Sequence, residues 1–97
     1  MRLTEREKTA IVGVVASFDP TAEVYLFGSR ADDAKRGGDI DLLIFSGCID
    51  RKTRRAIRRA ILDRIGEQKL DIVTAQGPAS MADPFVRLAR RNAVRLS

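Results

Sequence analysis

Residues 28–44 read GSRADDAKRGGDIDLLI. An apolar run at residues 24–27 leads into the Gly-Ser pair, and a second apolar run follows Asp39 and Asp41. Both runs have the length and the composition of β-strands. The stretch therefore predicts a strand, a Gly-Ser turn, a polar loop and a second strand.

The two aspartates of this stretch stand two residues apart on the predicted second strand. Because side chains alternate across a strand, Asp39 and Asp41 point to the same face, roughly 7 Å apart at the backbone. Two carboxylates this close are unfavourable unless a cation compensates their charge. The small-residue turn at Gly28 and Ser29 can approach a phosphate closely. Together these features indicate metal-nucleotide binding.

The composition narrows the class of protein. A chain of 97 residues that is 44% hydrophobic predicts one globular domain, residues 1–97. The absence of histidine excludes Ser-His-Asp catalysis, Cys-His catalysis and any His-ligated zinc site. Carboxylates are the remaining abundant ligands, and they suit Mg²⁺ or Mn²⁺. The net charge of +5 favours an anionic partner, such as nucleotide, RNA or an acidic protein face.

The sequence also predicts a compartment. The single Cys48 cannot form an intrachain disulfide, which fits a reducing environment. No signal peptide is visible, and no apolar run approaches the length of about 18 residues that a membrane span needs. We therefore expect a cytoplasmic protein that does not contact a membrane.

Local signals place the helices and strands. Thr4 is a good N-cap with Glu7 at capping-box spacing, and Asp19-Pro20 ends that first helix. The expected helices span about residues 4–17, 51–66 and 84–92, and the expected strands span about 23–27, 39–45, 69–74 and 94–96. We expect an α/β (α+β) fold, a small mixed β-sheet with helices packed mainly on one side.

Two of these helices carry further expectations. The last helix should bury Phe85, Leu88 and Ala89. The middle helix is crowded with basic residues, namely Arg51, Lys52, Arg54, Arg55, Arg58 and Arg59. We interpret this basic face as solvated, so RNA is a partner that the sequence allows but does not favour.

A third carboxylate extends the candidate site. Asp71 stands between Leu70 and Ile72 in an apolar run, where propensity alone would not place it. If its strand pairs beside the second strand, Asp71 joins the other two aspartates. Three carboxylates can hold two divalent ions about 3.5–4 Å apart, which polarise a phosphate and stabilise a leaving pyrophosphate. Ser29 would bind the triphosphate, with help from Arg30 and Arg36.

The order of these features resembles a known superfamily. Gly28-Ser29, nine further residues, Asp39-Ile40-Asp41 and a later Asp71 are similar to the DNA polymerase beta-type nucleotidyltransferases. The resemblance covers nearly the whole chain and implies the nucleotidyltransferase fold. It also implies that the three aspartates are the catalytic metal ligands and that Gly28 and Ser29 form the triphosphate turn. Gly38 departs from the pattern, since these proteins often have a serine there.

The short chain is similar to the minimal nucleotidyltransferases, which are often antitoxins of two-gene modules with a HEPN-domain toxin as partner. This resemblance implies Mg²⁺-dependent transfer of AMP from ATP to a hydroxyl, and in that group the acceptor is a tyrosine of the toxin. Two alternatives stay open. One is a binding module of the same fold that neutralises its partner by contact with little or no catalysis. The other is nucleotidyl transfer to RNA or to a small molecule.

Overall fold

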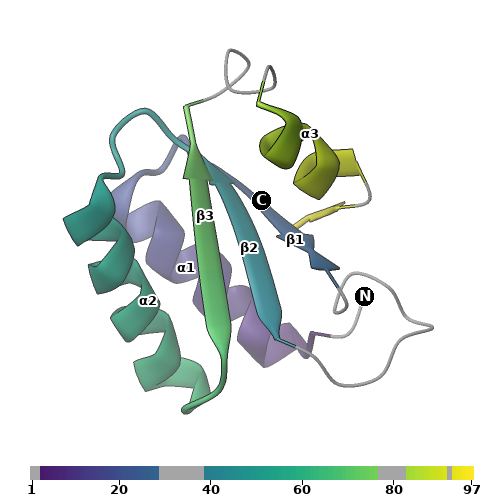
Figure 1. The fold of residues 1–97 in the computed structure, drawn as a ribbon. Coiled ribbons are helices and arrows are strands. Elements are labelled where there is room, and N and C mark those ends of the chain that lie inside the picture. Colours follow the sequence, from purple (N-terminus) through teal and green to yellow (C-terminus); the bar gives the residue numbers. More distant parts are fainter. Residues whose placement is uncertain (1–2, 29–38, 77–82, 92) are drawn as a thin grey trace.

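The computed structural model describes residues 3–28, 39–76, 83–91 and 93–97. In these parts of the chain the elements follow the order α1 (Glu5–Phe18), β1 (Glu23–Phe27), β2 (Ile40–Phe45), α2 (Arg51–Ile65), β3 (Leu70–Ala75), α3 (Pro84–Arg91) and β4 (Val94–Arg95). Figure 1 shows the sheet between the helix pair α1 and α2 and the shorter α3. The predicted elements are all present, and none of their bounds differs by more than one residue. None of the described helices is both long and apolar enough to cross a membrane.

Helix α1 starts and stops where the local chemistry of the chain predicts. The Thr4 hydroxyl accepts a hydrogen bond from the Glu7 backbone N–H, and the Glu7 carboxylate accepts one from the Thr4 N–H, both at 3.0 Å. This is the predicted capping box. At the other end, the Asp19 N–H donates to the Val15 carbonyl at 2.9 Å. Pro20 follows and does not favour further helix.

Helix α2 has the same kind of local limits. The Asp50 carboxylate accepts a hydrogen bond from the Thr53 N–H at 2.7 Å and so caps the first turn. Gly66 ends the helix with a φ of 92°, a backbone conformation that favours glycine. The helix is therefore held in place at both ends by residues next to it in the chain.

The four strands form one mixed sheet in the order β3-β2-β1-β4. Strand β1 runs antiparallel to both β2 and β4, whereas β2 and β3 run parallel. The register sets Asp41 opposite Asp71 on one side and opposite Phe27 on the other. Strand β2 starts at Ile40, so Asp39 lies immediately before the strand and not inside it.

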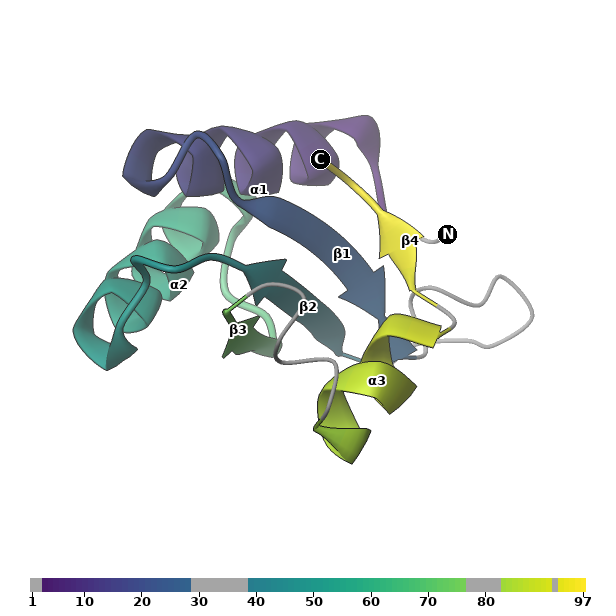
Figure 2. The same cartoon turned by 90° about the horizontal axis from the view of Figure 1, so that it is seen from above.

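The two faces of the sheet are covered by different helices, as Figure 2 shows from above. Alternate residues of β2, represented by Leu42 and Ile44, are fully buried in the cluster that packs against α1 and α2. The intervening positions, such as Leu43, face the smaller cluster with Val86 and Ala89 of α3. The α+β prediction with helices mainly on one side is confirmed, and α3 is the element on the other face.

The prediction that Leu88 is buried in the core is wrong. Leu88 of α3 is 67% exposed. The short helix contacts the sheet through Val86 and Ala89, three residues apart, so Leu88 falls on its outer side. Ala89 is buried as predicted, and the side chain of Phe85 lies outside the part of the chain that the structure describes.

A buried aspartate connects the end of α1 to the end of β2. The Asp19 carboxylate accepts hydrogen bonds from the Ser46 hydroxyl at 2.5 Å, the Thr21 hydroxyl at 2.8 Å and the Thr21 N–H at 3.0 Å. The Ser46 hydroxyl in turn accepts one from the Cys48 N–H at 3.2 Å. These donors, Ser46 first, hold the pKa of Asp19 well below its ordinary value. The charged carboxylate is therefore the form that the fold stabilises.

We predict that Asp19→Asn lowers the melting temperature at neutral pH. A carboxyl whose pKa is depressed by folding adds stability above its unfolded pKa of about 3.9, and this contribution is lost as pH falls below that value. The difference between wild type and variant should therefore shrink in melting curves recorded below about pH 4. Asp63→Asn, at an exposed carboxylate, is the control and should change little. A difference that stays constant at every pH would contradict the role of the charge.

Candidate active site

The three aspartates that the sequence singled out come together at one end of the sheet. Asp41 and Asp71 are direct neighbours on the parallel strands β2 and β3, so their side chains share a face. Asp39 precedes Asp41 by two residues and points to the same side. Each of the three offers a carboxylate oxygen, and these three oxygens lie within 4.8 Å of one another. The sheet register therefore builds an acidic cluster, called here the aspartate triad.

The surroundings of the triad disfavour its full negative charge. Burial, followed by the nearby charges of Asp71 and Asp39, raises the pKa of Asp41 above its ordinary value. Lys69 opposes this effect, and its Nζ lies 3.3 Å from Asp39 Oδ2. Both side chains of that ion pair are substantially exposed, so it compensates the triad only weakly. Most of the repulsion at Asp41 remains, and a bound cation would remove it.

The donor set of the triad fits a hard divalent ion. All three ligands are carboxylates, and oxygen ligands of this kind suit Mg²⁺ or Mn²⁺ better than the softer metals that prefer sulfur or imidazole. The exposure of Asp71 leaves the cluster open to a substrate from outside. The triad can therefore take part in metal-assisted chemistry on a phosphate.

Gly28 is the part of the predicted turn that the structure describes, and it touches the triad. It follows β1 with a φ of 73°, in the region that favours glycine. A Cβ at this position would overlap Asp41 Oδ2 and would lie 3.2 Å from Asp41 Cγ. The backbone angle strains any other residue here, and a Cβ would also displace the Asp41 carboxylate, so both features favour glycine.

Several predicted site residues fall outside the described residues. These are Ser29, Arg30, Arg36 and Gly38, so the triphosphate turn stays a prediction beyond Gly28. Conversely, sequence reasoning missed Lys69 beside Asp39 and the contact of Gly28 with Asp41. The signal for Lys69 was its place two residues before Asp71, on the same face of a strand.

Comparison with protein families matches residues 9–93 to a nucleotidyltransferase domain. Comparison with curated proteins gives no match. The matched range holds the whole aspartate triad, Gly28 and all of β1, β2 and β3. A match over this much of the chain agrees with the mixed sheet and with the acidic cluster at its end. The chain therefore belongs to the nucleotidyltransferase domain family and is a transferase by that membership.

Proposed function

We propose that the protein transfers AMP from ATP to a hydroxyl of a separate protein, in a reaction that depends on Mg²⁺ or Mn²⁺. The proposed acceptor is a tyrosine of a HEPN-type toxin, for which this chain would be the antitoxin. The observation that carries the catalytic part is the aspartate triad, with its three carboxylate oxygens within 4.8 Å of one another. The acceptor and the antitoxin role rest on the resemblance to minimal nucleotidyltransferases.

The chemistry requires one bond to form and one to break. The acceptor oxygen bonds to the α-phosphorus, the bond from that phosphorus to the β-phosphate oxygen breaks, and pyrophosphate leaves. The hydroxyl proton is released to solvent. When bound, the divalent metal supplies a positive charge that polarises the phosphate and stabilises the leaving pyrophosphate. Asp39, Asp41 and Asp71 would hold it.

The residues of this chain provide position and charge. Asp41 and Asp71 are fixed by neighbouring strands, so the geometry of these two members of the triad is set by the sheet. Gly28 brings its backbone up to Asp41 without a side chain in between. A nucleotide phosphate could therefore reach the triad from the end of β1, at Gly28.

The main alternative is a binding module that neutralises its partner by contact alone. In that case the triad would serve no purpose, although it places three like charges together and raises the pKa of Asp41. Such unfavourable groupings concentrate at functional sites. The retained triad therefore supports catalysis over simple contact, and the experiments below separate the two.

Metal and nucleotide should stabilise the protein through the triad. With Mg²⁺ and ATP at about 100 Kd the gain is about 2.7 kcal/mol, which is roughly 10–20 °C in Tm for a domain of this size. Asp41→Asn should remove the ligand-dependent shift. The same variant should raise the Tm of the metal-free protein, because it relieves the repulsion that raises the pKa of Asp41.

Thermal unfolding with and without Mg²⁺-ATP measures both effects, and Asp63→Asn is the matched control on α2, away from the triad. If Asp41→Asn keeps the full ligand-dependent shift, then nucleotide binds elsewhere on the chain. If it lowers the metal-free Tm, repulsion within the triad is not the dominant effect at this residue.

The transfer itself should need the acceptor protein. We expect labelled ATP and Mg²⁺ to label a HEPN-type protein encoded beside this chain's gene, on a tyrosine hydroxyl, and to leave this chain unlabelled. Asp41→Asn should reduce labelling by more than about 100-fold, since even the outer-shell partners of metal ligands are worth about 10–100-fold. Gel autoradiography and mass spectrometry of the acceptor give the readout.

Complex formation, measured by co-purification, is the control for this experiment, because Asp41→Asn changes a metal ligand and not the outer surface. Neutralisation of the toxin without any adduct, and equally by Asp41→Asn, would overturn the catalytic proposal in favour of the binding module. Label on RNA in place of protein would overturn the choice of acceptor only.

A further inference from the structure

The open edge of β3 carries a pocket that the proposed chemistry does not use. It has a volume of about 280 Å³ and is lined by Arg54, Arg55, Arg58, Leu70, Asp71 and Ile72. Three arginines of α2 and one member of the aspartate triad thus line the same pocket. We call Arg51, Arg54, Arg55 and Arg58, together with this pocket, the arginine face.

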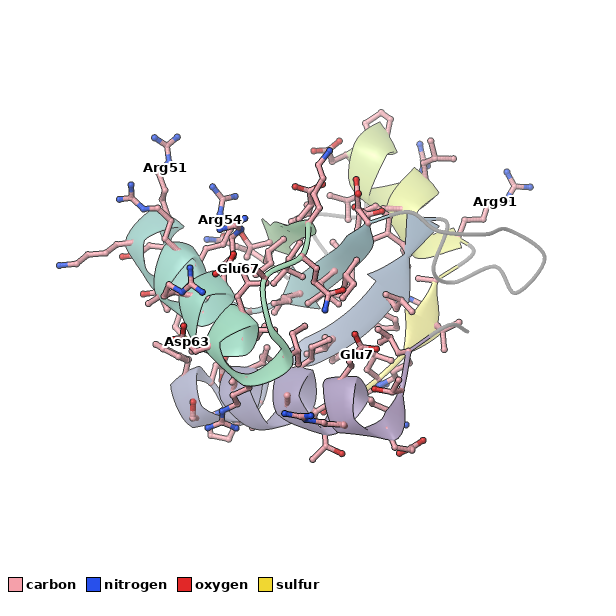
Figure 3. All side chains as sticks on the ribbon, turned by 90° about the horizontal axis from the view of Figure 1, so that it is seen from below. Glu7, Arg51, Arg54, Asp63, Glu67 and Arg91 are labelled. Atoms are coloured by element: carbon pink, nitrogen blue, oxygen red, sulfur yellow. The ribbon has the colours of Figure 1, made fainter. Side chains whose placement is uncertain are left out.

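The arginines of this face share one side of α2. They follow the spacing i, i+3, i+4 and i+7, which places them along one helix surface over about 10 Å. In Figure 3, Arg51 and Arg54 extend from the same end of α2, and Arg91 of α3 extends from the other side of the molecule. The positive charge is therefore a row that leads along α2 to the edge of β3.

This row is not compensated within the described part of the chain. The two acids near the C-terminal end of α2, Asp63 and Glu67, both pair with Arg59. No described ion pair engages Arg51, Lys52, Arg54 or Arg55. The first turn of α2 also has no acidic residue, although the helix dipole makes cations unfavourable there. Such an arrangement lowers helix stability, and it leaves the row of guanidinium groups available to an anionic partner.

A second polypeptide strand is a poor occupant for this edge. The Arg58 Nε donates a hydrogen bond to the Leu70 carbonyl at 3.1 Å. The carbonyls of Lys69 and Ala75 accept hydrogen bonds from the N–H groups of Ile40 and Ser46, at the two ends of β2. Because successive carbonyls of a strand point to opposite sides, the Leu70 carbonyl points to the open side. Arg58 is thus already bonded to the Leu70 carbonyl, the first outward-pointing carbonyl of β3 that an added β-strand would need as an acceptor.

In place of the solvated face expected from the sequence, we propose that the arginine face binds the phosphate backbone of a polynucleotide. A guanidinium group can donate two parallel hydrogen bonds to the oxygens of one phosphate. A row of arginines therefore fits the regularly spaced phosphates of a nucleic acid better than it fits a single carboxylate. Helix α2 has no aromatic residue on which bases could stack, so its contacts are to phosphate groups, which carry no sequence information directly. The bound polynucleotide would pass beside Asp71, a member of the triad. The inference concerns binding alone and holds with or without transfer activity.

The test is fluorescence anisotropy with a labelled single-stranded RNA of ~16 nucleotides, in EDTA and without ATP. We compare wild type with Arg54→Gln/Arg55→Gln, keeping Arg58 because it bonds to Leu70. The matched control, Arg87→Gln/Arg91→Gln, makes the same change in net charge on α3. A plot of log K against log salt has a negative slope, and the loss of two phosphate contacts should make that slope about 1.4 less steep. Binding should weaken about tenfold or more. The control should stay close to wild type in both quantities.

Melting curves show whether the variant is folded, and its Tm should equal or exceed that of wild type because two uncompensated cations leave the start of α2. Equal weakening by both double variants would overturn the site, since net charge alone would then explain binding. Unchanged affinity of Arg54→Gln/Arg55→Gln for the RNA would also overturn the proposed site. If poly-L-glutamate binds as tightly as RNA and depends on the same arginines, the partner is an acidic polypeptide and the phosphate assignment is wrong.

Discussion

The parallel register between β2 and β3 places Asp41 beside Asp71, and the site depends on that pairing. Apolar burial enforces this register, because Leu70 is 1% exposed in the cluster under α1 and α2. A slip of one residue would move Leu70 out of this core and turn Asp71 into it. The hydrophobic effect thus brings together two carboxylates that would otherwise repel each other.

At the same end of the sheet, the backbone of Gly28 lies against Asp41, in addition to the neighbouring carboxylates. Gly28 lets β1 end against Asp41, where a Cβ would displace the Asp41 carboxylate. Asp41 is therefore confined between β1 and β3, and its desolvation contributes most to its raised pKa. Family membership as a nucleotidyltransferase gives a reason for such an arrangement, since functional sites commonly trade stability for function.

Features encoded by neighbouring residues were predictable from the sequence. Thr4, Asp50 and Gly66 act within one helical turn of their position, so the helix limits followed from the chain alone. The shared side of Asp39 and Asp41 followed from strand alternation. By contrast, the Asp19–Ser46 hydrogen bond joins residues 27 apart, and the outer position of Leu88 depends on how α3 packs on the sheet. Such long-range packing has no local signal.

The topology also explains how strong charges of both signs can coexist around β3. The arginines belong to α2, which covers one face of the sheet, and the triad side chains belong to the opposite face. The two groups meet only at the strand edge, and no described ion pair joins an arginine of α2 to the triad. Because the sheet keeps them from neutralising each other, the carboxylates stay available to a cation and the guanidinium groups to an anion. A phosphate with its metal ion carries both charges, and this edge of the sheet presents a complement to each.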